Sequence, residues 1–306
     1  MFKTPILLIV FNRPQHAQKV FDQIKKVKPK YLFIAADGPR INYAEDLDKC
    51  VATRQIIEHI DWECELKTLF RDENRGCGHG PAEAITWFFE YVENGIILED
   101  DCLPSLSFFP FCEELLMKYS NDASIFMIAG SNAATTWKVR RSHYFFSLMG
   151  ISYGWATWRR AWTSFDYEIK NWGTKKAKRV LKDHLKKPTY FRIFSAEFDK
   201  IFKEKPTDIW DFQWLFARWI NNGKTIVPSV NLVSNIGFGD SATHTHQENH
   251  QLANLPLMEI KIPLQSYEKI DELHDWYVFE RFINPDSVSF SKKIALKMIR
   301  IYYNLP

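Results

Sequence analysis

Apolar and polar positions alternate in a regular way along the first 130 residues. Short apolar, β-branched runs predict buried strands, and the stretches between them repeat apolar residues every three or four positions, as amphipathic helices do. Strands are expected at residues 5–11, 31–36, 65–70, 96–98 and 125–129. Helices are expected at residues 14–27, 43–60, 79–93 and 105–119, with Val51, Ile56, Ile57 and Ile60 on the inner face of the second. This alternation predicts an α/β fold, a mostly parallel sheet flanked by helices on both faces.

The pattern becomes irregular and rich in tryptophan after residue 140. One strand is expected at residues 143–147, and helices are expected at 156–165, 190–203 and 209–222. Short strands at 225–227 and 260–262 and a terminal helix at 292–303 follow. Residues 234–251 hold glycine, asparagine and histidine without periodicity, which predicts a long loop. No repeat or clear linker divides the chain, so we expect one domain with a C-terminal extension.

Composition places the chain among globular proteins. Hydrophobic residues make up 46% of its 306 positions and aromatic residues 15%, which excludes a disordered chain. The formal net charge of +3 is too small to imply a nucleic-acid partner. No apolar run approaches the roughly 18 residues that span a bilayer, and residues 5–11 are too short for a signal peptide. The 5 cysteines lack zinc-site spacing, so we expect reduced thiols and a cytoplasmic protein.

Three consecutive carboxylates, Glu99, Asp100 and Asp101, directly follow the predicted strand at 96–98. Adjacent anions repel one another, and such a cluster becomes favourable when a divalent cation or a set of sugar hydroxyls lies against it. Mg²⁺ and Mn²⁺ prefer carboxylate oxygen and keep open positions for phosphates. Ligands of open α/β sheets bind beyond the carboxyl ends of the strands. We therefore expect a metal–phosphate site here, against the alternative of a solvated acidic loop.

Other polar side chains are predicted at the same sheet edge. Arg13 follows the first strand and suits bidentate contact with phosphate or a planar base, with an ordinary surface arginine as the alternative. Asp37 ends the second strand before a Gly-Pro turn, where aspartates also cap their own backbone. Residues 71–80, RDENRGCGHG, form a glycine-containing loop that leads into a helix N-terminus, which favours anions. His79 there has two interpretations, a nucleotide contact and a capping or solvent-facing side chain.

Two tryptophan-rich motifs lie in the second half of the chain. Residues 153–158, YGWATW, place three aromatics around a glycine, and the helical spacing of Trp155, Trp158 and Trp162 is more typical of core than of a ligand-binding surface. Apolar walls with convergent polar groups nevertheless also describe a small-molecule pocket. Residues 210–214, WDFQW, set Asp211 between large rings near a helix start, where the helix dipole favours a negative charge. If Asp211 is partly buried among those rings, its raised proton affinity suits a general base.

These motifs, in their order along the chain, resemble the GT-A-fold, nucleotide-sugar-dependent glycosyltransferases. The resemblance is carried by FNRP at 11–14, Asp37, His79, ILEDD at 97–101, GWATWRRAW at 154–162 and WDFQW at 210–214. It covers about residues 5–245 and is closest to the inverting N-acetylglucosaminyltransferase I group and its bacterial relatives. It implies a Rossmann-like catalytic domain at 1–252, with a nucleotide-binding half to about 130 and an acceptor half from 131, and a C-terminal extension at 253–306.

The resemblance also implies catalytic roles. Asp101 would ligate Mn²⁺ or Mg²⁺ bridging the donor diphosphate, with Asp100 near the ribose and Glu99 near the donor sugar. Asp211 would be the catalytic base. These roles suit glycosyl transfer, which needs a stabilised leaving phosphate and a deprotonated acceptor hydroxyl on the opposite face of the sugar.

The same resemblance implies a nucleotide site. Arg13, Asp37 and His79 would hold the nucleotide, with uridine as the expected base and a UDP-sugar as the expected donor. Residues 235–246 suit a loop that closes over a diphosphate, and His244 would help to bind the metal or the diphosphate. A disordered polar loop is the alternative for this segment.

Two stretches of the chain are rich in basic residues. Residues 174–187 are rich in lysine and arginine, and the helix at 292–303 mixes basic with apolar residues. Both are either solvated helix faces or surfaces that bind weakly to the anionic inner face of a membrane. The expected function is metal-dependent, inverting transfer of a sugar to a glycan or lipid-linked acceptor. The alternatives are a sugar nucleotidyltransferase, for which residues 11–16 lack the glycine-rich basic signature, and a non-catalytic nucleotide-sugar-binding module.

Overall fold

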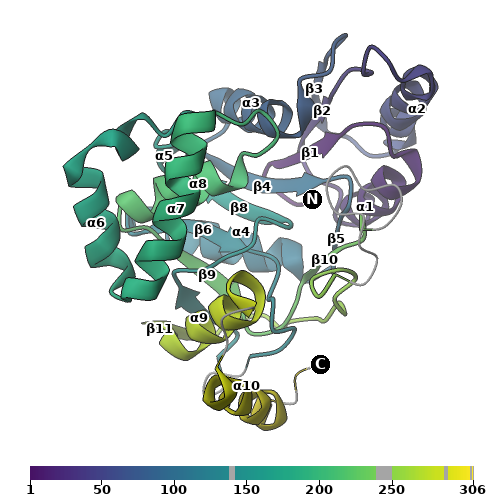
Figure 1. Ribbon diagram of the computed structural model, residues 1–306. Helices are drawn as coiled ribbons and strands as arrows, with labels where there is room; N and C mark the ends of the chain where they lie inside the picture. Colours follow the sequence, from purple (N-terminus) through teal and green to yellow (C-terminus); the bar gives the residue numbers. More distant parts are fainter. Residues whose placement is uncertain (138–141, 239–249, 286–288, 304, 306) are drawn as a thin grey trace.

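A nine-stranded sheet forms the centre of the computed structural model, which describes residues 1–137, 142–238, 250–285, 289–303 and 305 (Figure 1). Its strands are β1 (Ile6–Val10), β2 (Tyr31–Ala36), β3 (Glu65–Phe70), β4 (Asn94–Glu99), β6 (Ile125–Ala129), β7 (Tyr144–Ser147), β8 (Trp155–Trp158), β9 (Lys224–Pro228) and β11 (Ser266–Ile270). Their order is β11-β7-β9-β6-β8-β4-β1-β2-β3. A separate antiparallel pair joins β5 (Cys102–Pro104) to β10 (Val233–Asn235).

The helices follow the strands along the chain. They are α1 (Pro14–Val27), α2 (Ala44–Arg54), α3 (Gly76–Tyr91), α4 (Phe108–Lys118), α5 (Arg159–Trp162), α6 (Lys175–Leu185), α7 (Pro188–Glu204), α8 (Asp211–Ile220), α9 (Glu272–Val278) and α10 (Phe290–Tyr303). In Figure 1, α5 to α8 gather on one side of the molecule, α1 and α2 on the other, and α9 and α10 at one end. No helix among the described residues is long and apolar enough to cross a bilayer.

The sheet is mixed, and its parallel part confirms the expected α/β fold. β1 pairs in parallel with β2 and β4, and β2 does so with β3. β8 is antiparallel to both neighbours, β4 and β6, and thus separates the first parallel group from the rest of the sheet. β6 and β9 are parallel, as are β7 and β11, so parallel pairing predominates.

Two faces of the sheet carry separate cores because successive strand residues point to opposite sides. In β1, Ile6 and Leu8 belong to the core that includes α1 and α4. Leu7 and Ile9 belong to the core on the other face, which includes α3 and the start of α8. β1 is buried along its whole length, as expected for a strand covered on both faces.

A third core joins the later helices. Residues of α6, α7, α8 and α9 pack around buried aromatic side chains such as Trp172 and Trp219. α10 contributes Leu296, Ile299 and Tyr303 to this core, and Tyr303 stacks on Trp137 with ring centroids 4.1 Å apart.

The outer face of α10 has two adjacent stripes. Its apolar stripe is Ile294, Met298, Ile301 and Tyr302, which are 46%, 65%, 71% and 82% exposed. Its basic stripe is Lys293, Lys297 and Arg300, all exposed. At about 100° per residue the two stripes lie side by side; the apolar stripe faces away from the packed residues, and the basic stripe lies on the flank of the helix.

Several strands and helices have the bounds predicted from the sequence, and others do not. The expected helix at 156–165 is wrong in its first part, because Trp155–Trp158 form the buried strand β8. A strand sends residues three apart to opposite faces, and Trp155 and Trp158 accordingly lie in different cores. The expected strand at 260–262 is also wrong; β11 lies at 266–270 instead, and its mostly exposed, polar residues gave no apolar run.

The helix expected at 43–60 is shorter than predicted. α2 ends at Arg54, and a 3₁₀ turn, Gln55–His59, follows. Val51 was expected on the inner face and is 51% exposed, because α2 turns Asp46, Cys50 and Thr53 inward instead. The boundary at residue 252 stays a prediction, although β11 ties the C-terminal segment to β7.

Candidate active site

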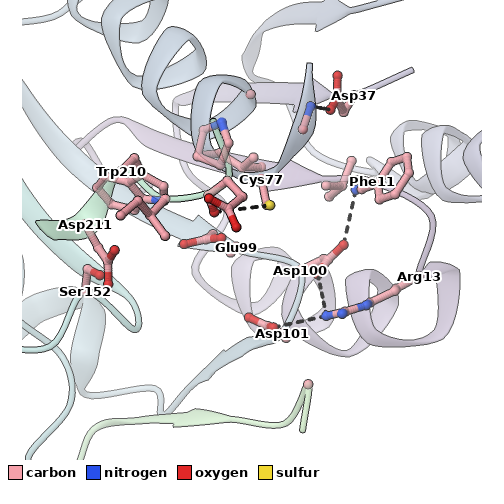
Figure 2. A pocket seen from close by; sticks show the side chains of 18 of the residues that line it. Phe11, Arg13, Asp37, Cys77, Glu99, Asp100, Asp101, Ser152, Trp210 and Asp211 are labelled. Carbon is pink, nitrogen blue, oxygen red and sulfur yellow. Dashed lines mark hydrogen bonds and ion pairs between the residues drawn. The ribbon is translucent and has the colours of Figure 1, made fainter. Parts of the chain in front are cut away.

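A cavity of about 510 Å³ lies at the carboxyl ends of β1, β2 and β4 (Figure 2). Parallel strands bring these ends to one sheet edge, as the sequence predicted. The start of α3, the turn before β8 and the start of α8 complete the walls. Its volume falls in the range of small-molecule sites. The predicted site residues that line it are Arg13, Asp37, Glu99, Asp100, Asp101 and Asp211.

The acidic cluster is held from one side by groups that follow β1. The Arg13 guanidinium donates from Nη1 to Oδ2 of Asp101 at 3.1 Å and lies 3.8 Å from Oδ1 of Asp100. The backbone N–H of Phe11 donates to Oδ2 of Asp100 at 3.1 Å. Arg13 is thus at the acidic cluster itself, and its expected contact with a nucleotide stays a prediction.

Negative charge in this cluster is only partly offset. Burial, then the neighbouring charges of Asp101, Asp100 and Asp211, raises the pKa of Glu99 to about 8, and Arg13 opposes the shift. Burial and the Asp101 charge raise the pKa of Asp100 to about 7, against the opposing effects of Arg13 and the Phe11 N–H. An approaching cation would relieve this repulsion.

The oxygen ligands of the acidic cluster fit a hard divalent cation whose coordination a substrate phosphate would complete. All three side chains of the cluster offer carboxylate oxygen, which Mg²⁺ and Mn²⁺ prefer. Within the described ranges, no group of three or more His, Cys, Asp or Glu side chains is arranged to hold a metal ion by itself. Mg²⁺ sites commonly use one or two carboxylates and complete their coordination with phosphates. The metal therefore stays a prediction that this geometry permits.

Asp37 fastens the 71–80 loop to the end of β2. Its carboxylate accepts backbone N–H groups from Arg75 at 2.9 and 3.0 Å, from Gly76 at 3.1 Å and from Gly38 at 3.0 Å. Burial raises the pKa of Asp37, and these hydrogen bonds oppose the shift. The observed role is to position the loop, with the Gly38 contact matching the local capping alternative. A contact with the nucleotide stays a prediction.

Of the two predicted histidines, His79 is described and lies outside the cavity wall. The His79 ring stacks on Tyr167, with centroids 4.0 Å apart and an interplanar angle of 16°, and it is not among the residues that line the cavity. His244 lies outside the described residues. Their proposed contacts with nucleotide, metal or diphosphate stay predictions.

Asp211 enters the cavity from the side opposite Arg13. It is the first residue of α8, and Figure 2 shows it beside Ser152, with the acidic cluster between it and Arg13. Asp211 is exposed while Trp210 beside it is 6% exposed, so the condition of partial burial, under which its proton affinity would rise, is not met. The proposal that Asp211 is a base therefore depends on its position in the cavity. A carboxylate in the first turn of α8 also matches the alternative, a charge that the helix dipole favours.

Residues not singled out from the sequence complete the walls. Ser152 and Tyr153 precede β8, Cys77 lies in the first turn of α3, and Phe238 follows β10. The Cys77 thiol donates to the backbone oxygen of Asp208 at 3.3 Å, and burial raises its pKa. Cys77, Tyr153 and Phe238 belong to stretches noted in the sequence, residues 71–80, 153–158 and 235–246, whereas no sequence pattern indicated Ser152.

Comparison with known proteins shows resemblance to solved structures only. No family model matches the sequence, and no curated protein matches it. A 4-diphosphocytidyl-2C-methyl-D-erythritol synthase from Anaerococcus prevotii is 9% identical, with a TM-score of 0.35 over 73% of this chain and 88% of that one. An apo UDP-glucose pyrophosphorylase is 10% identical, with a TM-score of 0.37 over 75% of this chain and 93% of that one.

Mouse xyloside xylosyltransferase 1 is another similar structure. It is 10% identical, with a TM-score of 0.34 over 71% of this chain and 81% of that one. These three scores are too low to support a conclusion about activity. The function must therefore be argued from the cavity itself.

Proposed function

We propose that the protein is a metal-dependent, inverting glycosyltransferase that uses a nucleotide-diphosphate sugar, with a UDP-sugar as the expected donor. One observation carries the proposal: a single cavity has an under-compensated carboxylate cluster on one wall and a separate carboxylate, Asp211, on another. Single-displacement transfer needs both, because the leaving group departs from one face of the sugar while the acceptor attacks the other.

The acidic side of the cavity would bind the donor. Asp101 would hold the Mn²⁺ or Mg²⁺ ion, since its carboxylate is 19% exposed whereas that of Asp100 is 11% exposed and accepts the Phe11 N–H. Such a cation, when bound, supplies Lewis-acid stabilisation of the leaving diphosphate. Arg13 would keep the Asp100 and Asp101 carboxylates in place through its two ion pairs.

Asp211 would act on the acceptor. Its carboxylate would accept the proton of the acceptor hydroxyl as the new bond forms between that oxygen and the sugar C1. The bond from C1 to the phosphate oxygen breaks in the same step, and the nucleoside diphosphate leaves with its electron pair. Glu99 lies between the acidic cluster's other members and Asp211 in Figure 2, and the Asp211 charge helps to raise the pKa of Glu99, which supports a reacting centre between them.

Calorimetry tests the metal and donor assignment. UDP affinity should depend on Mn²⁺ or Mg²⁺ in the wild type, and Asp101→Ala should abolish that dependence. Asp72→Asn, on the exposed part of the 71–80 loop, is the matched carboxylate control and should bind like the wild type. Equal wild-type affinity in EDTA and in Mn²⁺ would refute the metal assignment.

Turnover tests the base. Asp211→Asn should keep donor affinity and lower turnover by about two to four decades, the range for loss of a general base. The anomeric configuration of the product, read by NMR, should be inverted. Unchanged turnover in Asp211→Asn, or a retained configuration, would remove Asp211 from this role.

Product analysis distinguishes glycosyl transfer from the alternative, a sugar nucleotidyltransferase. A sugar nucleotidyltransferase would make a nucleotide sugar and pyrophosphate from a nucleoside triphosphate and a sugar phosphate. It shares the sheet and the need for a metal. Formation of pyrophosphate, without transfer from any nucleotide sugar, would favour that alternative over glycosyl transfer.

A further inference from the structure

Tyr153 lines the active-site cavity and directly follows Ser152, which lies beside Asp211 in Figure 2. Its ring is partly buried and packs against the core that includes α1 and α4. The Phe238 ring meets it edge-on, with centroids 6.3 Å apart and planes at 82°. These two contacts restrict the direction in which the Tyr153 side chain can point.

The backbone at Tyr153 is fixed as well. The buried Ser131 hydroxyl lies 3.0 Å from the backbone oxygen of Tyr153 and 3.1 Å from that of Val233, within hydrogen-bond distance of both. The backbone oxygen of the next residue, Gly154, accepts the Gly130 N–H at 2.8 Å. The position of the Tyr153 hydroxyl therefore does not depend on a bound substrate.

The hydroxyl of Tyr153 is available to a ligand. Within the described ranges of the chain it makes no hydrogen bond to another residue. Its oxygen is not one of the buried polar atoms that lack a partner, so it is accessible from the cavity. A buried tyrosine usually finds a partner for its O–H group, and here the cavity has the space for one.

Negative groups from both walls of the cavity lie near this hydroxyl. Burial raises the pKa of the Tyr153 phenol, and nearby negative charges that include Asp101 and Asp211 raise it further. The phenol therefore stays protonated at neutral pH and can donate a hydrogen bond. Two other donors that line the cavity, Arg13 and Cys77, already have partners in the chain.

The proposed roles of Asp101 and Asp211 indicate which part of a donor would meet the hydroxyl. Asp101 would hold the metal that binds the diphosphate, and Asp211 would act on the opposite face of the sugar. The phosphate attached to the sugar would therefore lie between these two carboxylates, where the Tyr153 hydroxyl also lies. A phosphate oxygen is an anionic acceptor, and hydrogen bonds to such acceptors are strong.

We propose that Tyr153 is a catalytic residue whose hydroxyl donates a hydrogen bond to the β-phosphate of the donor, the phosphate that leaves C1. As the bond between C1 and the phosphate oxygen breaks, its electron pair stays on that oxygen and negative charge develops there. The hydroxyl stabilises this charge from a fixed position, and its proton stays on Tyr153. This assignment rests on the proposed glycosyl transfer and adds a residue to it.

Calorimetry with UDP and UMP in Mn²⁺ tests the contact, because only UDP carries the β-phosphate. Tyr153→Phe removes the hydroxyl and keeps the ring. It should lower UDP affinity by about 10–100-fold, the loss expected for a hydrogen bond to a charged group, and leave UMP affinity unchanged. Tyr91→Phe, at a residue that is 50% exposed and does not line the cavity, is the matched control and should bind both nucleotides like the wild type. Unchanged UDP affinity, or equal losses for UDP and UMP, would overturn the proposal.

Two further measurements exclude an indirect effect. Urea unfolding of Tyr153→Phe should have a midpoint close to that of the wild type, and Tyr153→Met replaces it in the same assays if it does not fold. Mn²⁺ should still raise the UDP affinity of Tyr153→Phe, because the hydroxyl donates to the phosphate and is not a ligand of the metal. A variant whose UDP affinity no longer responds to Mn²⁺ would assign the loss to the metal site and overturn the proposal.

Transfer assays distinguish this inference from the function on which it rests. With an active donor, Tyr153→Phe should lower kcat by at least about tenfold, because the hydrogen bond strengthens as charge develops on the leaving phosphate. An unchanged kcat would overturn the role of Tyr153 and leave glycosyl transfer intact. A wild type that neither binds UDP nor transfers a sugar would instead refute the proposed function.

Discussion

Gly237 lies against the carboxylate proposed to hold the metal, so the smallest possible side chain at this position should disturb the site. A Cβ atom on Gly237 would lie 2.2 Å from Oδ2, 2.6 Å from Cβ and 2.8 Å from Cγ of Asp101. Non-bonded carbon contacts favour about 3.5–4.0 Å, so one of the two groups must move by about 1 Å.

The backbone around Gly237 is the less mobile of the two. The Ile236 N–H donates to the backbone oxygen of Asp101 at 2.8 Å, and the Gly237 N–H donates to Oδ1 of Asn235 at 2.8 Å. The preceding residues pair with β5 in the antiparallel β10. In Gly237→Ala the Asp101 carboxylate should therefore turn away and lose its contact with Arg13.

Two measurements on Gly237→Ala follow. Crowding of this kind should lower the free energy of unfolding by about 1–3 kcal/mol, measured by urea denaturation. Calorimetry should show UDP affinity in Mn²⁺ reduced by about 10–100-fold, the loss typical when a ligand's supporting contacts change.

A remote glycine supplies the control. A Cβ on Gly223 would lie 2.6 Å from two ring atoms of Phe126, a comparable clash at a residue that does not line the active-site cavity. Gly223→Ala should lose similar stability and keep UDP affinity. If the wild type needs Mn²⁺ and Gly237→Ala binds UDP equally well, the reasoning about Asp101 is wrong.

Two further predictions concern stability and location. Burial lowers the pKa of His184 in α6 from 6.5 to about 4, so the fold favours the neutral ring, and stability is full above about pH 6.5 and lost as pH falls toward 4. Between pH 7.5 and 4.5 the free energy of unfolding of the wild type, measured with urea, should fall by about 2.5 kcal/mol more than that of His184→Gln. The exposed His59→Gln is the control, and an equal pH dependence of wild type and His184→Gln would contradict this prediction. We also propose that the stripes of α10 bind anionic membrane, each basic residue adding about 1 kcal/mol. Serine at the aliphatic positions of the apolar stripe should reduce co-sedimentation with anionic vesicles, and equal binding to neutral vesicles at low salt would refute it.

Local patterns were enough to predict the sheet edge that carries the site. The runs that form β1, β2 and β4 are short and apolar, and polar or turn residues follow them, so the sequence predicts where each strand ends. Charged residues placed immediately after these ends, such as Arg13 and Asp101, necessarily meet at one edge when the strands are parallel. That is why the acidic cluster and Arg13 were found from sequence.

Features that depend on tertiary contacts could not be predicted from local sequence patterns. The exposure of Asp211 depends on how α8 packs on the sheet. The rings of Trp210 and Trp214 are buried, yet Asp211 itself is exposed. Asp37 follows the predicted strand, but its partners come from a loop about forty residues later, which no local pattern reveals. A second cavity of about 430 Å³ has walls from α7, α8 and α9, which are far apart in the chain, so its shape exists only after these helices pack.

The direction of β8 explains how the segment before it comes to line the active-site cavity. In the antiparallel register with β4, Trp155 lies opposite Ile97, so the residues just before β8 lie beside the end of β4 and its carboxylates. Gly154, with φ of +57°, makes the turn there that a larger residue would strain. A helix at 156–165 would have sent this segment elsewhere. The strand instead brings Ser152 and Tyr153 to the wall of the active-site cavity, beside the acidic cluster.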